Sequence, residues 1–215
     1  MTKPIAIIDC SIQTPAHQCF NRLVDYFDMP FTYHLPSLYG MESLKKCDFN
    51  KAIILGSLSN VEDRLPWQIE LADFSYEKIK EGHAFLGICF GHQLMADRFG
   101  GQVSSISDNN LPQNGTRQFE ILSDTPLFQK GESFKTVITH SYEVTVLPKD
   151  FIHLATSKSC HYEALAHKAL PYYSFQGHPE ASMAFIQRQV KIIKEQEILK
   201  AQEDGLEIIR RFIEL

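Results

Sequence analysis

A single cysteine stands between two glycines, where an apolar run gives way to a helix-like pattern. The stretch from Phe85 to Met95 reads FLGICFGHQLM, which spaces the residues as Gly-x-Cys-x-Gly around Cys89. A sharp turn from strand to helix with small neighbours lifts one side chain above the sheet edge. The helix start supplies unpaired amides and the positive end of the helix dipole, and both favour a thiolate. We therefore predict that Cys89 is a nucleophile and that the amide of Phe90 donates to an oxyanion.

A base for this thiol is found late in the chain, in the stretch YYSFQGHPE that ends at Glu180. Because a residue before proline is pushed towards extended conformations, Pro179 should hold His178 outside helical geometry. Residues two apart on an extended segment point to the same side, so Glu180 can lie beside the imidazole and fix its tautomer. Together these residues predict a Cys-His-Glu triad. The alternatives are a solvated turn at residues 178–180 and a structural, buried Cys89.

The chain has further histidines, and their spacing does not indicate a metal. Five of the eight others are His92, His140, His153, His161 and His167. None belongs to an HExxH or CxxC spacing that would point to zinc. A lone histidine in a strand is more often a structural or surface residue. We therefore expect no metal and no cofactor.

The segments that must position the triad are alternately strand-like and helix-like in their residue pattern. Strands are expected at 4–9, 31–35, 51–57 and 84–88, and helices at 17–27, 67–82 and 90–99. The runs 51–57 and 84–88 are apolar on both faces, which is typical of central parallel strands. This alternation predicts an α/β fold with a mostly parallel central sheet and helices on both faces.

The second half of the chain has a different pattern. Strand-like runs at 117–122, 134–147, 151–157 and 172–176 predict the far edge of the sheet and a small antiparallel β layer. From about residue 182 to 215 the pattern is helical, and Gly205 is expected to interrupt it. The apolar positions of this segment are Met183, Ile186, Val190, Ile193, Ile198, Leu206, Ile209 and Phe212. The whole chain, 1–215, is interpreted as a single domain.

Composition excludes several classes of protein. The chain has 215 residues and a formal net charge of -5, with no dense block of lysine and arginine before its C-terminal segment. Neither nucleic acid nor a membrane is therefore an expected partner. No run approaches the roughly 18 apolar residues of a spanning helix, and the first apolar run is too brief for a signal peptide. Five cysteines without paired spacing do not indicate a disulfide framework, so a cytoplasmic location is expected.

Four segments taken together resemble class I glutamine amidotransferases, from Pro4 to about Glu180. They read ILGSLSNVEDRLPW from Ile54, LGICFGHQLMADRFGG from Leu86, THSYEVTVLPKDFIHLATS from Thr139 and FQGHPE from Phe175. The resemblance implies a flavodoxin-like fold with Cys89 as nucleophile, His178 as base and Glu180 as the residue that orients the base. The oxyanion residues that it implies are Gly56, Ser57 and Phe90, and the substrate-binding residues are Gln93, His140 and Ser141.

This chain departs from the family pattern at three places. It has Gly56, Ser57 and Leu58 where the family's loop has two glycines before a proline. Tyr142 stands where an acidic residue is common, and Gly177 stands where many members have a bulky residue. The triad is intact, but these changes leave the identity of the leaving group open. The motifs are most similar to those of stand-alone GMP-synthase-like amidotransferases and γ-glutamyl peptidases.

Three functions are compatible with this sequence, all with a small-molecule ligand that is glutamine or a γ-glutamyl compound. The first is hydrolysis of that ligand through a cysteinyl thioester. The second is a glutaminase subunit that delivers ammonia to a separate synthetase partner. The apolar stripe from Ile186 to Phe212 could form the docking face, and packing of this stripe against the sheet is the alternative. The third is a non-catalytic binding or sensing protein on the same fold.

Overall fold

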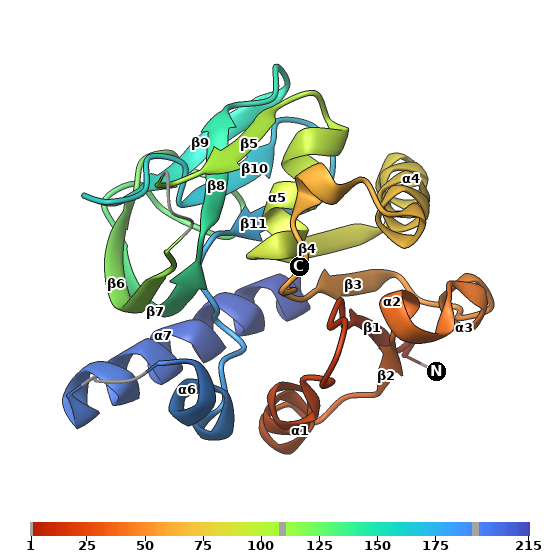
Figure 1. Ribbon diagram of the computed structural model, residues 1–215, viewed down its shortest axis with the longest axis horizontal. Coiled ribbons are helices and arrows are strands. Elements are labelled where there is room, and N and C mark those ends of the chain that lie inside the picture. Colours follow the sequence, from red (N-terminus) through yellow and green to blue (C-terminus); the bar gives the residue numbers. More distant parts are fainter. Residues whose placement is uncertain (1, 108–110, 191–193) are drawn as a thin grey trace.

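The molecule is built around a nine-stranded sheet, with a second, two-stranded sheet beside it (Figure 1). The structure is a computed structural model and describes residues 2–107, 111–190 and 194–215. Its strands are β1 (Ile5–Ile8), β2 (Phe31–His34), β3 (Lys51–Ile54), β4 (Ala84–Ile88), β5 (Gln102–Ser105), β6 (Gln113–Ile121), β7 (Ser133–His140), β8 (Tyr142–Val146), β9 (Phe151–Thr156), β10 (Ala164–His167) and β11 (Tyr172–Phe175). Its α-helices are α1 (His17–Tyr26), α2 (Pro36–Tyr39), α3 (Glu42–Lys45), α4 (Pro66–Lys80), α5 (Phe90–Arg98), α6 (Met183–Gln189) and α7 (Glu195–Glu214), and a 3-10 turn η1 spans Val61–Asp63.

One half of the large sheet is parallel and has the strand order β2-β1-β3-β4-β11. β1 pairs in parallel with β2 and β3, β3 pairs with β4, and β4 pairs with β11. Helices connect the strands of the first half of the chain, close to the predicted bounds. The prediction of an α/β fold is confirmed. The short helices α2 and α3 were not predicted.

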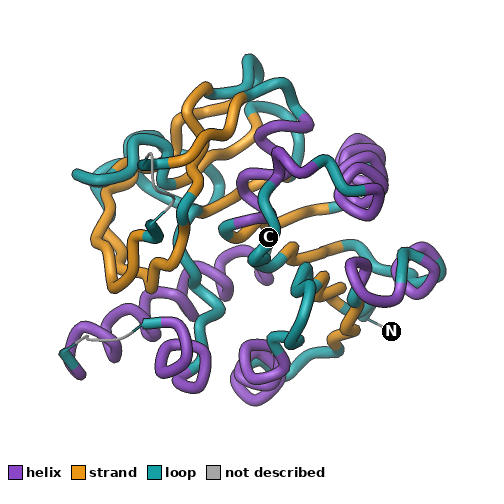
Figure 2. Tube along the Cα trace, viewed as in Figure 1, coloured by secondary structure: helices purple, strands orange, loops and turns teal. Residues whose placement is uncertain are grey.

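The central strands are buried on both faces, because successive residues of a strand point to opposite sides. In β1, Ile5 and Ile7 belong to the core beneath α1 and α7, whereas Ala6 and Ile8 belong to the core beneath α4 and α5. Figure 2 shows the corresponding arrangement, with helices on both sides of the strands. A strand that is buried on both faces therefore needs an apolar residue at every position.

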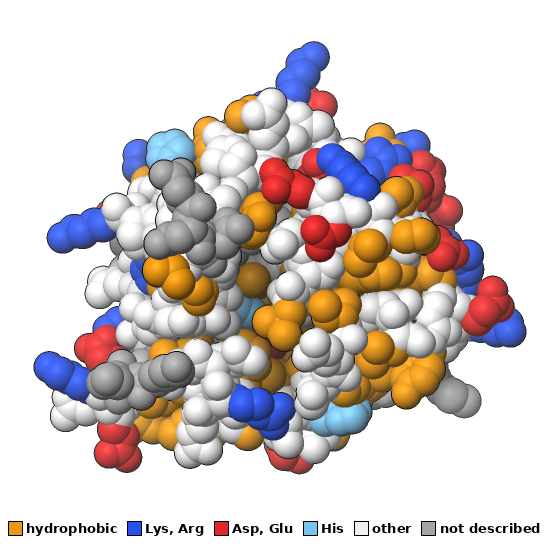
Figure 3. Space-filling model, in the orientation of Figure 1, with side chains coloured by type: hydrophobic (Ala, Val, Ile, Leu, Met, Phe, Trp, Pro, Cys, Tyr) orange, Lys and Arg blue, Asp and Glu red, His pale blue; other side chains and the backbone are white. Residues whose placement is uncertain are grey.

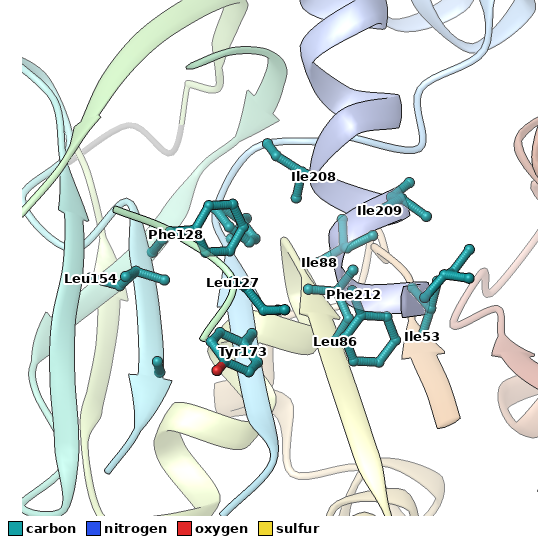
Figure 4. Close-up of a cluster of buried hydrophobic side chains, with 14 of the residues drawn as sticks. Ile53, Leu86, Ile88, Leu127, Phe128, Leu154, Tyr173, Ile208, Ile209 and Phe212 are labelled. Atoms are coloured by element: carbon teal, nitrogen blue, oxygen red, sulfur yellow. The ribbon is translucent and has the colours of Figure 1, made fainter. Parts of the chain in front are cut away.

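The core beneath α7 ties the last helix to the middle of the sheet. Phe212 of α7 is fully buried. Figure 4 shows its ring close to Ile53 of β3 and to Leu86 and Ile88 of β4. The C-terminal helix thus covers the strands that lead into the turn at Cys89.

The other half of the large sheet is antiparallel, and β5 pairs with β8 in the small sheet. β11 pairs with β10, β10 with β9, β9 with β6 and β6 with β7, all antiparallel. The prediction of an antiparallel layer in the second half is confirmed. β11, the last strand in the sequence, lies between β4 and β10. Because β4 and β11 are parallel neighbours, the segments that follow them emerge at the same edge of the sheet.

The C-terminal segment forms two helices, and one prediction about it is wrong. α7 runs without interruption from Glu195 to Glu214, so Gly205 does not break it. A Cβ built on Gly205 would lie 2.4 Å from the carbonyl oxygen of Pro179. The glycine therefore allows the helix to approach the turn that follows β11 closely, rather than ending the helix. α6 ends at Gln189, and the apolar position Ile193 lies outside the described residues.

Candidate active site

Cys89 lies at the turn from β4 into α5 and has an unusual backbone conformation. Its φ is 50° and its ψ is -101°, and residues with a side chain rarely have a positive φ. The turn is held on both sides. The amide of Cys89 donates to the carbonyl of Phe175 at 2.9 Å, and the carbonyl of Cys89 accepts from the amide of Gln93 at 3.0 Å. This strained strand-to-helix turn has the character of a nucleophile elbow.

The two glycines that flank Cys89 allow backbone segments to pack directly on one another. A Cβ on Gly87 would lie 2.8 Å from the carbonyl oxygen of Gly91. A Cβ on Gly91 would lie 2.5 Å from the carbonyl oxygen of Ile54 in β3. Both distances are too short for a real side-chain carbon. The first turn of α5 therefore rests on β3 and β4, and this contact places Cys89 at the edge of the sheet.

His178 and Glu180 lie on the turn after β11 and form a buried pair. Nδ1 of His178 lies 2.8 Å from Oε1 of Glu180, and the two side chains are 4% and 3% exposed. The amide of His178 donates to the carbonyl of Val137 in β7 at 2.7 Å. The ring of Phe185 in α6 packs against the imidazole at a centroid distance of 4.9 Å. The imidazole is thus fixed by a carboxylate, a strand and an aromatic ring.

The thiol and the imidazole meet at the edge of the sheet. A Cβ built on Gly56 would lie 2.9 Å from Cε1 of His178 and 3.6 Å from Cβ of Cys89, so both side chains border the same glycine. Nε2 of His178 is buried, and no nitrogen or oxygen of the described residues bonds to it. The charge of an ionised Cys89 side chain raises the pKa of the His178 imidazole. The second ring nitrogen is therefore available for proton exchange near the sulfur.

The neighbours of His178 decide its charge. Burial lowers the pKa of the imidazole, but the negative charges of Glu180 and of a Cys89 thiolate raise it, and the hydrogen bond to Glu180 adds to the rise. The net result is a pKa well above the usual value of 6.5. The raised pKa favours the protonated ring, and an imidazolium can stabilise an adjacent thiolate and give a proton to a leaving group.

Glu180→Gln is expected to lower the pKa of His178. The amide oxygen of glutamine can still accept from Nδ1, but the negative charge that raises the pKa is removed. An NMR titration of the imidazole should show wild-type His178 protonated through neutral pH and the variant losing its proton at lower pH. Glu195→Gln, at an exposed position at the start of α7, is the matched control. An identical His178 titration in wild type and Glu180→Gln would contradict this account.

One pocket contains both reactive side chains and has a volume of about 250 Å³. Its lining includes Cys89, His178 and Glu180, together with Gly56 and Ser57. The ring of Phe90 instead packs against Trp67, at a centroid distance of 5.5 Å. Phe90 is the first residue of α5, so its amide has no acceptor within the helix. The structure thus gathers the predicted triad and the predicted oxyanion loop around one space.

Another wall of the pocket was not predicted from the sequence. It is formed by the loop between β1 and α1, residues 11–16, and by part of α6. The carboxylate of buried Asp9 holds this loop, because it accepts from the amides of Ser11 and Ala16 at 2.9 and 2.7 Å. The hydroxyls of Ser11 and Tyr33 donate to the same carboxylate. The sequence feature that could have indicated this wall is Asp9, an acidic residue directly after the buried strand β1.

Three residues that the resemblance assigns to substrate binding do not line this pocket: Gln93, His140 and Ser141. Nε2 of Gln93 donates to the carbonyl of Tyr142 at 2.6 Å, and Nδ1 of His140 donates to the same oxygen at 3.0 Å. Burial, aided by the positive charge of Arg117, lowers the pKa of His140 to about 3, so its ring is neutral. Gln93 and His140 therefore brace the turn between β7 and β8.

Three further observations concern the surface, the helices and the metal-binding side chains. On the face shown in Figure 3, hydrophobic side chains gather near the middle, while most charged side chains lie towards the edges. Within residues 2–107, 111–190 and 194–215, no helix is long and apolar enough to cross a membrane. In the same residues, no three side chains of the metal-binding types come together as a metal site.

Sequence comparison links the chain to known proteins. The sequence model of the family Glutamine amidotransferase class-I matches residues 7–191. A glutamine-hydrolyzing GMP synthase subunit from Methanospirillum hungatei is 37% identical over 118 residues, which are 54% of this chain and 61% of that protein. The corresponding GMP synthase subunit from Methanosphaera stadtmanae is 41% identical over 96 residues, which are 44% of this chain and 50% of that protein. The chain thus matches these curated relatives over little more than half of their length.

Solved structures share the fold over the whole chain. A glutamine amidotransferase from Methylobacillus flagellatus has a TM-score of 0.76 at 16% identity, covering 100% of this chain and 95% of that one. A glutamine amidotransferase from Thermotoga maritima has a TM-score of 0.75 at 18% identity, covering 100% and 97%. At these identities the likeness concerns the fold alone, whereas the family match covers residues 7–191. The chain therefore belongs to the class I glutamine amidotransferase family.

Proposed function

We propose that the chain hydrolyses the side-chain amide of glutamine, with Cys89 as nucleophile, His178 as acid and base, and Glu180 as the residue that orients the imidazole. The observation that carries this proposal is the convergence, on one pocket, of a thiol on a positive-φ turn and a carboxylate-bound imidazole. The curated relatives are named as glutamine-hydrolyzing GMP synthase subunits, which supports glutamine as the substrate.

The first half of the proposed reaction releases ammonia. The Cys89 thiolate attacks the side-chain carbonyl carbon of glutamine, a carbon–sulfur bond forms, and the carbonyl oxygen becomes an oxyanion. The amide of Phe90 and one from Gly56 or Ser57 donate to that oxygen. The His178 imidazolium then gives its Nε2 proton to the amide nitrogen, the carbon–nitrogen bond breaks, and ammonia leaves.

The second half returns the enzyme to its starting state. His178, now neutral, takes a proton from a water molecule as the water attacks the thioester carbonyl. The same donors hold the second oxyanion, the carbon–sulfur bond breaks, and glutamate leaves. Glu180 keeps Nδ1 as the protonated nitrogen throughout, so Nε2 alone exchanges protons with the reacting groups.

We further propose that the released ammonia is passed to a separate synthetase partner, and that residues 1–215 fold as one domain. The first point is supported by the relatives, which are named as subunits of a synthase. The second is supported by a single large sheet that contains both β1 and β11, with α7 packed over β7.

A second candidate substrate is a γ-glutamyl peptide, and one feature of the pocket favours it. The lining extends past the thiol to Arg188 and Gln189 of α6. Arg188 is exposed, and its guanidinium donates to the side chain of Gln18 at 3.3 Å. A group attached to the γ-nitrogen that carries a carboxylate could pair with this arginine.

The test is release of glutamate by the purified chain from glutamine and from γ-glutamyl dipeptides, between about pH 6 and 9. Faster turnover of glutamine supports the amidotransferase proposal, and faster turnover of dipeptides supports the second candidate. A partner requirement predicts that glutamine turnover rises when a synthetase co-purified from the native cell is added. If no substrate yields glutamate and Cys89 forms no glutamyl adduct in either condition, the hydrolase proposal fails and a binding or sensing role is left.

A further inference from the structure

We propose that Gln176 is a positioning residue that stabilises the Cys89 thiolate, and that Gln93 orients the side-chain amide of Gln176 in the free protein. This inference rests on the proposed role of Cys89 as nucleophile. It concerns how the free protein holds its sulfur before any substrate arrives. Neither residue lines the pocket that contains Cys89.

Gln176 is buried directly behind the thiol. It follows β11, its side chain has no exposed surface, and its Nε2 lies 3.8 Å from Sγ of Cys89. The backbone of Gln176 is also fixed, because its amide donates to the carbonyl of Glu163 at 2.8 Å. The amide group of Gln176 is thus held against the sulfur from within the protein.

The orientation of this amide follows from a chain of hydrogen bonds. The carbonyl of Tyr142 can only accept, so the group of Gln93 that lies 2.6 Å from it must be the NH₂ group. The same NH₂ group lies 3.1 Å from Oε1 of Gln176 and donates to it. Since the oxygen of Gln176 is occupied in this way, its NH₂ group must face Cys89. The Tyr142 carbonyl thereby sets the direction of the whole chain.

A donor that faces sulfur favours the anionic form. An N–H group bonds more strongly to a thiolate than to a thiol. The sulfur also lies 4.0 Å from the carbonyl oxygen of Thr139, and this acceptor can serve only the protonated thiol. Gln176 is uncharged, so it adds to the effect of the His178 imidazolium without repelling it. The amide of Gln176 therefore shifts the balance from thiol to thiolate.

The family resemblance gives Gln93 a second role, contact with bound glutamine, and the two roles have different experimental readouts. A residue that contacts bound glutamine should raise KM when removed and leave the free thiol unchanged. A residue that orients Gln176 should change the reactivity of the thiol in the absence of substrate. Measurements on the free protein therefore separate them.

The experiment measures alkylation of Cys89 by iodoacetamide as a function of pH, with each cysteine followed by peptide mass spectrometry. Gln176→Leu is expected to slow alkylation of Cys89 at neutral pH by roughly tenfold or more and to move the rate profile to higher pH. Gln176→Glu keeps an acceptor for Gln93 but turns an oxygen towards the sulfur. The rate of Cys89 alkylation should therefore fall further in this variant than in Gln176→Leu. Cys47, which is half-buried, reports in the same sample on any general change of the protein.

The control variant is Gln118→Leu, at an exposed position on β6. Gln93→Leu should slow alkylation as well, and the double variant Gln93→Leu/Gln176→Leu should be no slower than Gln176→Leu alone, because the two residues act in series. An unchanged Cys89 profile in both Gln176 variants, with normal circular dichroism, would overturn the inference. An effect of Gln93→Leu on KM alone would overturn the part that concerns Gln93. If wild-type Cys89 reacts no faster than Cys47, it is the nucleophile proposal itself that fails.

Discussion

Replacing Cys89 with alanine is expected to lower glutamate release by at least about 10⁴-fold. Without the sulfur no thioester can form, and His178 and the oxyanion donors can assist only direct attack by water. The backbone strain is unchanged, since both residues carry a Cβ at a φ of 50°. The variant should therefore fold, and a coupled assay for glutamate together with intact-mass detection of the glutamyl adduct measures the effect.

Cys47→Ala is the matched control for this loss. Cys47 is half-buried, its sulfur lies 3.4 Å from Oγ1 of Thr32, and it is absent from the lining of the pocket. Glutamate release should be the same as in wild type. Substantial turnover by Cys89→Ala, or an equal loss in both variants, would mean that the nucleophile has been assigned incorrectly.

Gly91→Ala is expected to destabilise the protein by about 3 kcal/mol and to slow alkylation of Cys89. Alanine is normally the better helix former. Here its Cβ would lie 2.5 Å from the carbonyl oxygen of Ile54, so the start of α5 must move away from β3. Because Cys89 directly precedes that helix turn, the thiol moves with it. Urea unfolding gives the loss of stability, and iodoacetamide gives the change at the sulfur.

Gly100→Ala makes the same substitution at the other end of α5. Gly100 has a φ of +89° and nothing within 4 Å of a built Cβ, so alanine there meets backbone strain without a clash. The expected cost is roughly 1–2 kcal/mol, with no effect on Cys89 alkylation. Equal costs for the two variants, and an unchanged thiol in Gly91→Ala, would show that the close approach of α5 to β3 is not what positions Cys89.

Local patterns were sufficient to predict the parallel half of the sheet. Residues 51–57 and 84–88 are apolar on both faces, and residues 67–82 have helical spacing, so β3, β4 and α4 could be recognised, whereas α5 was inferred from the strand-turn-helix pattern around Cys89. The turn at Cys89 could also be anticipated, because glycines two residues before and after a central residue are typical of a sharp strand-to-helix turn that presents a nucleophile. The pairing of His178 with Glu180 was predicted from an extended segment, but Pro179 and Glu180 lie in a turn closed by the amide of Ala181 and the carbonyl of His178, and this turn brings Oε1 of Glu180 to Nδ1 of His178.

Contacts between distant segments could not be predicted in the same way. Gly205 carries the usual signal for a helix end, but its role depends on Pro179, which lies on a separate turn. The side chain of Gln93 faces Tyr142 and Gln176, and nothing in the sequence around Gln93 reveals that orientation. The wall formed by residues 11–16 likewise depends on where the loop after β1 lies relative to β3 and β11.

The position of β11 also determines when the site can exist. The turn at Cys89 is synthesised well before His178, with β5 to β10 between them. A growing chain on the ribosome therefore exposes its thiol without its imidazole, and the two meet only when the final strand inserts beside β4. Pairings between segments so distant in sequence form slowly. A chain that ends before β11 therefore lacks the His178–Glu180 pair that lies beside Cys89 in the complete sheet.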